Sequence, residues 1–362
     1  MKKTALPLLT TACVCIPLFF SACSKKSAAE ADAAGTGTNS NVLYLFNWTY
    51  YTPDSVLRQF EQKYNCTVKV DSYDSNEVMY AKLKAGGGIG YDITIPGQDY
   101  VAIMKEQGML EKIDQQQFTN RKYINPEVLK KSTVDPGMEY SVPYYFGASG
   151  ICVNKQKLQN YSRSWNIFED SRIAEHASMM DDMREVLGDA LAYLGYSVNT
   201  TDEKQLKEAA ALVADKWKPN LVKFDAEGFG KSFAAGDFWV CQGYAEVVYG
   251  EVPEEKWDDM IDFFIPEEGG PAYYECMVIL KGSKHYDLAM KFINFIHEPQ
   301  IYAEFLDAFR FPASVNLEAA KYTTKTPMYT VDDLKNCEIR LDLGEHLGLW
   351  NEHWQDIRFS AN

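Results

Sequence analysis

The chain has few basic residues relative to acidic ones, and this imbalance limits the partners it can bind. Its 362 residues include 36 Lys and Arg against 51 Asp and Glu, which gives a formal net charge of -15. Such a charge repels phosphate backbones and anionic lipid surfaces. We therefore expect no nucleic-acid binding, and we expect cationic ligands if the excess of acid gathers at one site.

Closely spaced cysteines are also missing. The chain beyond the first forty residues keeps an odd number of cysteines, and no two of them have CxxC spacing. This pattern indicates neither a disulfide framework nor a zinc knuckle. Most of them are expected to be small, buried apolar residues. They are Cys66, Cys152, Cys241, Cys276 and Cys337.

Sequence motifs of catalysis are absent as well. The glycines of 86-GGGIG-90 follow a predicted helix and precede a predicted strand, whereas a phosphate loop runs from strand to helix. In 147-GASG-150 the residue two places after Ser149 is Ile151 rather than the Gly of a nucleophile elbow. His346 and His353 lie seven residues apart without further ligands at matching spacing, which favours an ordinary helix over a metal site. We expect no cofactor, no metal and no internal repeat.

The N-terminus has the pattern of an export signal. Lys2 and Lys3 precede an apolar run to Phe20, and 20-FSAC-23 places two small residues before a cysteine. This arrangement resembles a bacterial lipoprotein signal, which implies a signal peptide at 1–22 and lipidation of Cys23. The alternative of a transmembrane anchor is disfavoured by the polar residues and the proline of the run. The small, polar residues that follow predict a flexible tether over 23–41.

From Val42 onward strands and helices alternate. The order strand, helix, strand, helix predicts an α/β fold with a parallel sheet. Thr52 and Pro53 are expected to be the cap and the first residue of the first helix. The stretch 139–154 has strand-like composition without a helix before it, which suggests a passage into a second domain. The predicted strands are 42–48, 66–73 and 91–96, and the predicted helices are 75–86, 100–110, 184–196, 203–217 and 284–309.

Acidic residues recur beside aromatic ones. Asp182 and Glu185 are three apart and share the first turn of a predicted helix, where acids often serve only as caps. Aromatic clusters with neighbouring polar or acidic residues occur at 48-WTYY-51, 244-YAE-246 and 273-YYE-275. A carboxylate neutralises an ammonium group, and an aromatic face attracts it by about 0.5 to 2 kcal/mol. Each cluster alone is also compatible with core or surface, but together they suit a flexible chain of methylenes that carries several positive charges.

Several stretches together resemble one known family. They are 46-FNWTYYTP-53, 73-YDSNEVMYAKLKAG-86, 91-YDITIPG-97, 107-QGMLEKID-114, 141-SVPYYFGASGICVN-154, 181-DDMREVLGDALAYLGYSVNTTD-202 and 291-KFINFIHEP-299. This set resembles the bacterial spermidine/putrescine-binding proteins, the extracytoplasmic receptors of polyamine ABC importers. The resemblance implies a two-lobed periplasmic-binding-protein fold of type II, in which each lobe is a sheet flanked by helices and a hinge lets the lobes close on a ligand. The lobes are expected at 42–146 plus 275–320 and at 147–274 plus 321–362.

The resemblance also implies a ligand site. In the family's pattern Trp48, Thr49 and Tyr51 match a segment that flanks the polyamine, and Asp182 and Glu185 match an acidic pair that binds ammonium groups. The remaining implied positions combine stacking with charge. Tyr244 and Phe311 stand at aromatic positions, and Tyr273 and Glu275 at an aromatic and acid pair. Asp99 lies in a segment that usually offers Ser and an aromatic residue, and is expected to supply a further anion.

Several positions depart from the pattern: Tyr244 stands where the family commonly has Trp, and Phe311 where it commonly has Tyr. Glu275 is one methylene longer than the usual Asp, which alters the amine spacing that fits. Arg340 stands where spermidine binders offer a neutral polar group, and a guanidinium there repels an ammonium unless Asp99, Glu275 or another acid pairs with it.

These observations together predict a monomeric receptor tethered to the membrane only by its N-terminal lipid. It is expected to capture spermidine or putrescine outside the cytoplasm and to deliver it to an ABC permease, without acting as an enzyme. A second interpretation is a protein of the same fold for another small cationic solute, or for an anion held by Arg340. A third is an enzyme resembling a glycosidase, with Asp182 and Glu185 as acid and base, which requires one carboxyl with a raised pKa.

Overall fold

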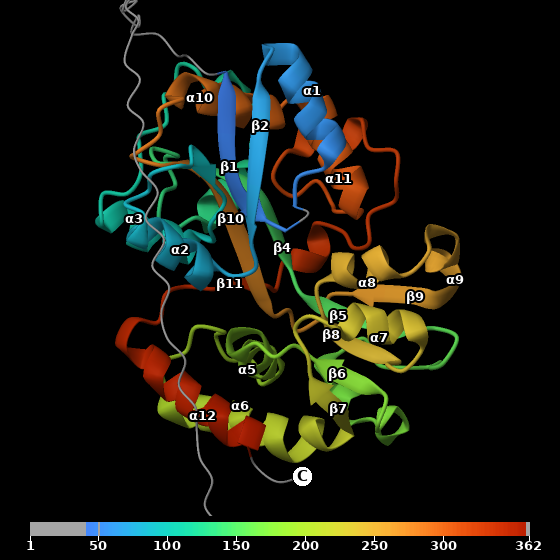
Figure 1. Cartoon of the computed structure of the whole chain (residues 1–362). Coiled ribbons are helices and arrows are strands. Elements are labelled where there is room, and N and C mark those ends of the chain that lie inside the picture. Colours follow the sequence, from blue (N-terminus) through green and yellow to red (C-terminus); the bar gives the residue numbers. More distant parts are fainter. Residues whose placement is uncertain (1–40, 50, 360–362) are drawn as a thin grey trace, which may run out of the picture. The chain divides into compact units, whose positions relative to one another are not determined.

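The computed structural model describes residues 41–49 and 51–359 (Figure 1). The predicted signal peptide and the lipidation residue Cys23 lie outside the described residues. The chain from Asn41 onward forms one compact unit that contains two hydrophobic clusters of its own. This part of the chain therefore has the cores that it needs to fold independently.

The first sheet of this unit has six strands and is mixed. Its order is β11-β10-β3-β1-β2, and β4 pairs with β10. β1 runs parallel to β2 and β3, as the alternation of strands and helices predicts, whereas β10 is antiparallel to β3 and β4. The strands are β1 (Val42–Trp48), β2 (Thr67–Tyr73), β3 (Ile93–Thr94), β4 (Ser141–Ala148), β10 (Pro271–Ile279) and β11 (Glu338–Ile339).

The helices that connect these strands present apolar residues to the core. In α1, Val56 and Phe60 lie one turn apart and are fully buried. Pro53 is the N-cap residue of α1 rather than its first helical residue, because the Thr52 hydroxyl is bonded to Asn47 Nδ2 and the Tyr144 hydroxyl and cannot cap the helix. These helices are α1 (Asp54–Tyr64), α2 (Asn76–Ala85), α3 (Gln98–Glu106), α4 (Pro126–Lys131), α10 (Tyr286–Ile296) and α11 (Pro299–Phe309).

The second sheet has five strands in the order β7-β6-β8-β5-β9. β6 runs parallel to β7 and β8, and β5 is antiparallel to both β8 and β9. The strands are β5 (Gly150–Asn154), β6 (Ala177–Met179), β7 (Leu221–Phe224), β8 (Val240–Gly243) and β9 (Ile261–Phe264). The α-helices that follow β5 and precede β10 are α5 (Met183–Tyr193), α6 (Glu203–Leu212), α7 (Phe229–Ala235), α8 (Ala245–Glu251) and α9 (Trp257–Met260).

Short helical turns complete the connections. The predicted helix 203–217 ends as a π-helix, η4 (Val213–Trp217), which continues directly from α6. The 3-10 turns are η1 (Thr119–Tyr123), η2 (Trp165–Glu169), η3 (Ser171–Ile173), η5 (Lys218–Asn220), η6 (Glu254–Lys256), η7 (Leu317–Lys321), η8 (Asp332–Leu334) and η9 (Gly344–His346).

The chain passes between the two sheets more than once. β4 ends at Ala148 in the first sheet and β5 begins at Gly150 in the second, so the predicted single run at 139–154 is two strands in different sheets. The chain returns between β9 and β10. β11 then pairs with the start of β10, although it lies within 321–362, the segment that the sequence assigns to the second lobe. The exact lobe limits stay a prediction, but Figure 1 shows β4 leading directly into β5.

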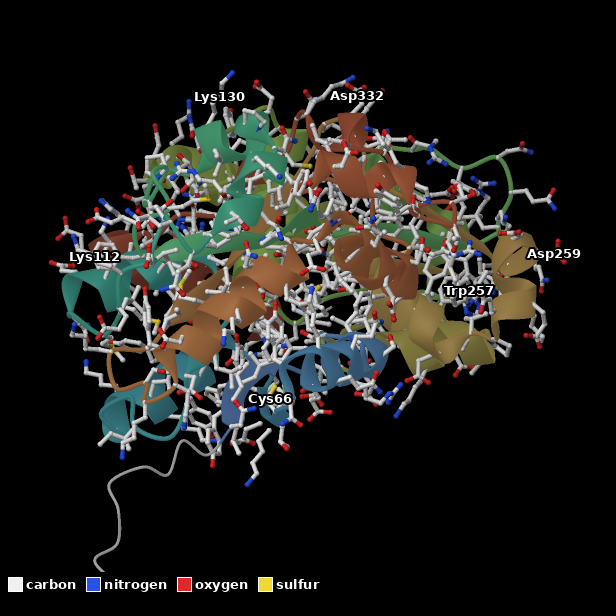
Figure 2. The ribbon with its side chains drawn as sticks, turned by 90° about the horizontal axis from the view of Figure 1, so that it is seen from above. Cys66, Lys112, Lys130, Trp257, Asp259 and Asp332 are labelled. Atoms are coloured by element: carbon white, nitrogen blue, oxygen red, sulfur yellow. The ribbon has the colours of Figure 1, made fainter. Side chains whose placement is uncertain are left out.

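Many charged residues lie at the periphery, and most cysteines of the described chain lie inside. Figure 2 shows Lys112, Lys130, Asp259 and Asp332 at the outer edge of the ribbon. The cysteines of the described chain are free, and all but Cys66 are buried. Within residues 41–49 and 51–359 no helix is long and apolar enough to cross a bilayer. The same residues contain no group of three or more His, Cys, Asp or Glu side chains placed to hold a metal ion.

The C-terminal helix α12 (Leu347–Phe359) lies against α5 and α6 (Figure 1). Its Trp350 is fully buried, and the indole N–H donates to the Thr200 carbonyl at 3.1 Å. The Arg184 guanidinium stacks over the same ring at 4.9 Å. One side chain of α12 thus supports the helix α5, which carries Asp182 and Glu185 at its start.

Replacing Trp350 tests this support. Trp350→Ala should lower the free energy of unfolding by about 3 to 5 kcal/mol through the lost packing. Trp350→Phe, which keeps a ring but loses the N–H, should cost less. Chemical denaturation of both variants measures the difference, and a loss below about 1 kcal/mol for the alanine variant would contradict a supporting role for α12.

Candidate ligand-binding site

The residues at the end of β1 lie beside the loop that follows β3. The Trp48 indole donates to the Ile95 carbonyl at 2.9 Å and contacts the Tyr73 ring at 4.8 Å between centroids. Thr49 is exposed, and its hydroxyl makes only a long 3.4 Å contact with the Tyr73 carbonyl. Tyr51 is buried, yet its hydroxyl has no hydrogen-bond partner within the described residues by distance and angle. This end of the strand is therefore partly engaged in core packing and partly left open for a further contact.

Glu275 is a buried acid without a cation. It lies on β10 two residues after Tyr273, so the two side chains share one face of the strand. Only 8% of Glu275 is exposed, its Oε2 has no hydrogen-bond partner, and it forms no ion pair within the described part of the chain. A backbone bridge to Gly97 brings the start of α3, and with it Asp99, beside this position. Buried carboxylates are otherwise nearly always paired, so Glu275 is a candidate for binding a cation.

The electrostatic environment of Glu275 favours its neutral form. Burial raises the pKa of its carboxyl to about 8, while the Tyr51 hydroxyl lowers this pKa, Glu246 raises it and Arg340 lowers it. Burial likewise raises the pKa of Glu246 to about 7. Burial also raises the pKa of Asp99, and Arg340 opposes that rise. A cation that binds among these carboxyls stabilises their charged forms and therefore releases protons.

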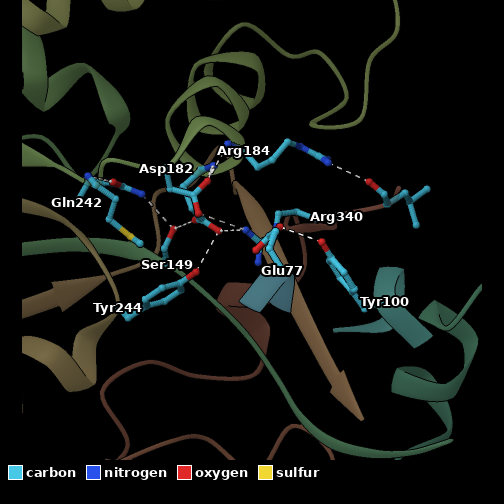
Figure 3. A network of polar contacts seen from close by, with 11 residues as sticks. Glu77, Tyr100, Ser149, Asp182, Arg184, Gln242, Tyr244 and Arg340 are labelled. Carbon is cyan, nitrogen blue, oxygen red and sulfur yellow. Dashed lines mark hydrogen bonds and ion pairs between the residues drawn. The ribbon is translucent and has the colours of Figure 1, made fainter. Parts of the chain in front are cut away.

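A second acidic group surrounds the start of α5 and is already paired. Asp182 caps the helix, because its Oδ1 accepts from the backbone N–H groups of Arg184 at 2.8 Å and Glu185 at 3.1 Å. Arg340 Nη1 lies 2.9 Å from Glu185 Oε1 and 3.9 Å from Asp182 Oδ2. Ser149 donates to Glu185 Oε2 at 2.6 Å, and Figure 3 shows Ser149, Asp182 and Arg340 converging at this point. The ammonium-binding pair implied by the sequence thus holds a guanidinium of the chain itself.

Aromatic rings connect the two acidic groups. The Tyr244 hydroxyl donates to Glu185 Oε1 at 3.3 Å, while its ring meets Tyr273 edge to face at 5.6 Å. Tyr273 in turn contacts Tyr145 at 6.0 Å. Phe311 is buried and stacks on Tyr145 at 4.3 Å, so it lies behind this tyrosine as part of the core. The aromatic residues form a continuous wall that begins at Glu185 and continues past Glu275.

The predicted site residues therefore fall into two linked groups. We name the first the Arg340 cluster, which consists of Ser149, Asp182, Glu185, Tyr244 and Arg340. We name the second the Glu275 cluster, which consists of Tyr51, Asp99, Glu246, Tyr273 and Glu275. Trp48 and Thr49 lie at the end of β1, three and two residues before Tyr51, and Phe311 lies behind the aromatic wall.

Two members of these clusters are absent from the sequence prediction. Glu246 belongs to the 244-YAE-246 stretch, and its placement after an aromatic residue was a usable signal. Ser149 is flanked by glycines, and nothing in that pattern indicates that it binds Glu185. Only the pairing of β5 with β8 and the packing of α5 bring Ser149 and Glu185 together.

Comparison with known proteins identifies the family. The family model described as bacterial extracellular solute-binding protein matches residues 55–332. The chain belongs to this family. It is 33% identical over 342 residues to the spermidine/putrescine-binding periplasmic protein of Escherichia coli K12, an alignment that covers 92% of this chain and 94% of that one.

Further relatives agree with this assignment. The putrescine/cadaverine-binding protein of Pseudomonas aeruginosa PAO1 is 34% identical over 273 residues, which cover 73% of this chain and 76% of that one. Among solved structures, the TpPotD lipoprotein of Treponema pallidum superimposes with a TM-score of 0.84 at 51% identity, and the match covers 88% of this chain and all of that one. The two-lobed solute-binding fold expected from the sequence is confirmed.

The glycosidase interpretation meets one of its requirements at α5, because burial raises the pKa of the Glu185 carboxyl, but the contacts of both carboxyls oppose it. A general acid must hold a proton that it can transfer to a leaving group. The Oδ1 of Asp182 is bonded to backbone N–H groups, and Glu185 accepts from a hydroxyl on each oxygen and from a guanidinium. These contacts hold both carboxylates in place as acceptors.

The raised pKa of Glu275 makes a prediction about stability. The folded state binds this proton more tightly than the unfolded chain does, so the stabilisation from Glu275 is present below about pH 4.5 and is lost as the pH rises towards 8. In the ligand-free protein Glu275→Gln should therefore be at least about 1 kcal/mol more stable than wild type at pH 8.5, with little difference at pH 4. Denaturant unfolding at both pH values measures this, with Glu352→Gln, an exposed residue of α12, as control. Equal stability of the Glu275 variant and wild type at both pH values would place Glu275 in a solvated or paired environment.

Proposed function

We propose that this protein is an extracytoplasmic receptor that binds a protonated polyamine between its two sheets and delivers it to an ABC permease. The observation that carries the proposal is the buried carboxyl of Glu275, which has an unpartnered oxygen and no cation within the described chain. An ammonium group supplies the missing positive charge and donates up to three hydrogen bonds.

The aromatic wall suits the carbon chain of such a ligand. Tyr244 and Tyr273 are only half-buried, and they stand next to the acids of both clusters. Aromatic faces attract ammonium groups and cover adjoining methylenes. A molecule with positive charges separated by short alkyl segments matches this alternation of acid and ring. The curated relatives named for spermidine, putrescine and cadaverine support this ligand class.

The sequence and its relatives support an extracytoplasmic, lipid-anchored location for the receptor. The family is extracellular, and the Treponema pallidum relative is named as a lipoprotein. Cys23 after an apolar run fits the same arrangement, with the lipid as the membrane attachment of a monomeric receptor. No covalent chemistry is part of this function.

The main alternative ligand is a different small solute. A cation with one positive charge would pair with Glu275 but would leave the other carboxyls of the Glu275 cluster, Asp99 and Glu246, without a cation. An anion held by Arg340 would have to replace Glu185, a carboxylate already fixed by Ser149 and Tyr244. The polyamine therefore agrees better with the charges of the site.

Calorimetric titration tests the proposal. The chain from Asn41, refolded free of carried-over ligand, should bind at least one of putrescine, cadaverine and spermidine with a Kd in the micromolar range or below. Glu275→Gln should weaken that binding by about 1.5 to 3 kcal/mol, because it removes a charge-assisted hydrogen bond. The control Glu352→Gln should bind as wild type does. A folded protein that binds none of these amines would contradict the proposed function, and unchanged binding by Glu275→Gln would remove Glu275 from the site.

A further inference from the structure

The Arg340 cluster satisfies the acid that the sequence assigns to ligand binding. Glu185 is 1% exposed, and each of its oxygens has a donor from the chain: Ser149 on Oε2, and Tyr244 and Arg340 on Oε1. The 2.9 Å contact with Arg340 is a charge-assisted hydrogen bond of the kind that an ammonium group would make. In this structure Glu185 is therefore already paired with a cation of the chain itself, the guanidinium of Arg340.

The backbone around Arg340 fixes this guanidinium in place. Arg340 follows β11 directly, and its N–H donates to the Ala272 carbonyl of β10 at 3.1 Å. The next residue is bound from the other side, since the Leu341 N–H donates to Asn199 Oδ1 at 2.8 Å and Arg184 Nη1 donates to the Leu341 carbonyl at 3.0 Å. The segment is tied to the first sheet and to residues around α5, so Arg340 is held at the acidic pair by strand pairing and by side-chain bonds.

The carboxyls of the Glu275 cluster form no ion pair within the described residues: Arg340 pairs with Asp182 and Glu185, and at Glu275 and Asp99 its charge only opposes the rise in pKa. The Glu275 oxygen and the Tyr51 hydroxyl both lack hydrogen-bond partners within residues 41–49 and 51–359. The two clusters are nevertheless adjacent, because the rings of Tyr244 and Tyr273 touch. At one end of the acidic surface the chain thus pairs Glu185 with its own cation, whereas at the other end Glu275 has no ion pair within the described residues.

We propose that Arg340 is an internal cation that occupies the Asp182 and Glu185 subsite and thereby restricts the receptor to diamines. This inference rests on the proposed function and specifies which polyamines it accepts. A diamine places its charges against the Glu275 cluster. Spermidine carries an additional aminopropyl arm with a third positive charge, and this arm would have to approach the guanidinium.

The cost of accommodating that third charge has two sources. An ammonium beside a half-buried guanidinium is repelled, and this repulsion is screened less than at an open surface. Displacing Arg340 instead would leave its guanidinium without the Glu185 partner. Arg340 is therefore a specificity-determining residue, and its removal should have opposite consequences for triamines and diamines.

Titration of wild type and Arg340→Gln with putrescine, cadaverine and spermidine tests this inference. Glutamine keeps a hydrogen-bond donor for Glu185 and removes the charge. Wild type should bind at least one of the two diamines at least about tenfold more tightly than spermidine. In Arg340→Gln the affinity for spermidine should rise at least about tenfold, while that for the preferred diamine should change less than about threefold. Lys130→Gln removes a charge at the periphery and should change none of the affinities.

The outcomes separate this inference from the proposed function. Wild type that binds spermidine as tightly as the diamines would overturn the role of Arg340 while leaving the receptor function intact, and this measurement needs no variant. Arg340→Gln that loses affinity for all amines would show that Arg340 supports the site instead of limiting it. Absence of binding to every amine by wild type and variant alike would overturn the receptor function itself. Arg340→Lys, which retains a charge, should keep the preference of wild type for diamines and serves as a second variant if the glutamine form does not fold.

Discussion

The site depends on a buried carboxyl, that of Glu275, which forms no ion pair within the described part of the chain. Glu275 lies inside the protein because β10 pairs with both β3 and β4, which places alternate residues of the strand on a covered face. Burial of a carboxyl without a partner is costly, and the protein meets this cost by holding the group near neutrality. A cationic ligand removes the cost, so the same feature that destabilises the empty site provides the driving force for binding.

The two acidic clusters illustrate two ways of keeping carboxyls inside a protein. At the start of α5 the chain supplies its own donors, and Glu185 is bound by Ser149, Tyr244 and Arg340. At β10 no cation is paired with Glu275, the Tyr51 hydroxyl offsets burial only in part, and the pKa is raised instead. The rings of Tyr244 and Tyr273 lie between these two environments. The charge of Glu185 is therefore fixed by an ion pair with Arg340, whereas the charge of Glu275 depends on pH and on the bound ligand.

Sequence patterns predicted the helices, the strands and the family more successfully than they predicted the contacts between side chains. The alternation of strands and helices, the two sheets and the aromatic and acidic stretches are local features, and the structure contains them. The pairing of Arg340 with Glu185 joins residues 155 positions apart through β11, a two-residue strand with almost no pattern of its own. Similarly, the stacking of the buried Phe311 ring on Tyr145 could not be predicted from the sequence, and the role of Phe311 in ligand stacking stays a prediction. The position of Glu246 near an aromatic residue is visible in the sequence, whereas its effect on the pKa of Glu275 depends on tertiary structure.

The most direct test of this account is the number of protons released when a diamine binds. Calorimetry of putrescine or cadaverine binding at pH 7, repeated in buffers with different ionisation enthalpies, gives this number without any mutation. The amines stay protonated at this pH, since alkyl ammonium groups have a pKa near 10. Because the pKa values of Glu275 and Glu246 are about 8 and about 7, binding should release a substantial fraction of a proton or more. Binding without proton release would mean that these carboxyls are already ionised or lie away from the ligand, and it would contradict the central role of the uncompensated charge.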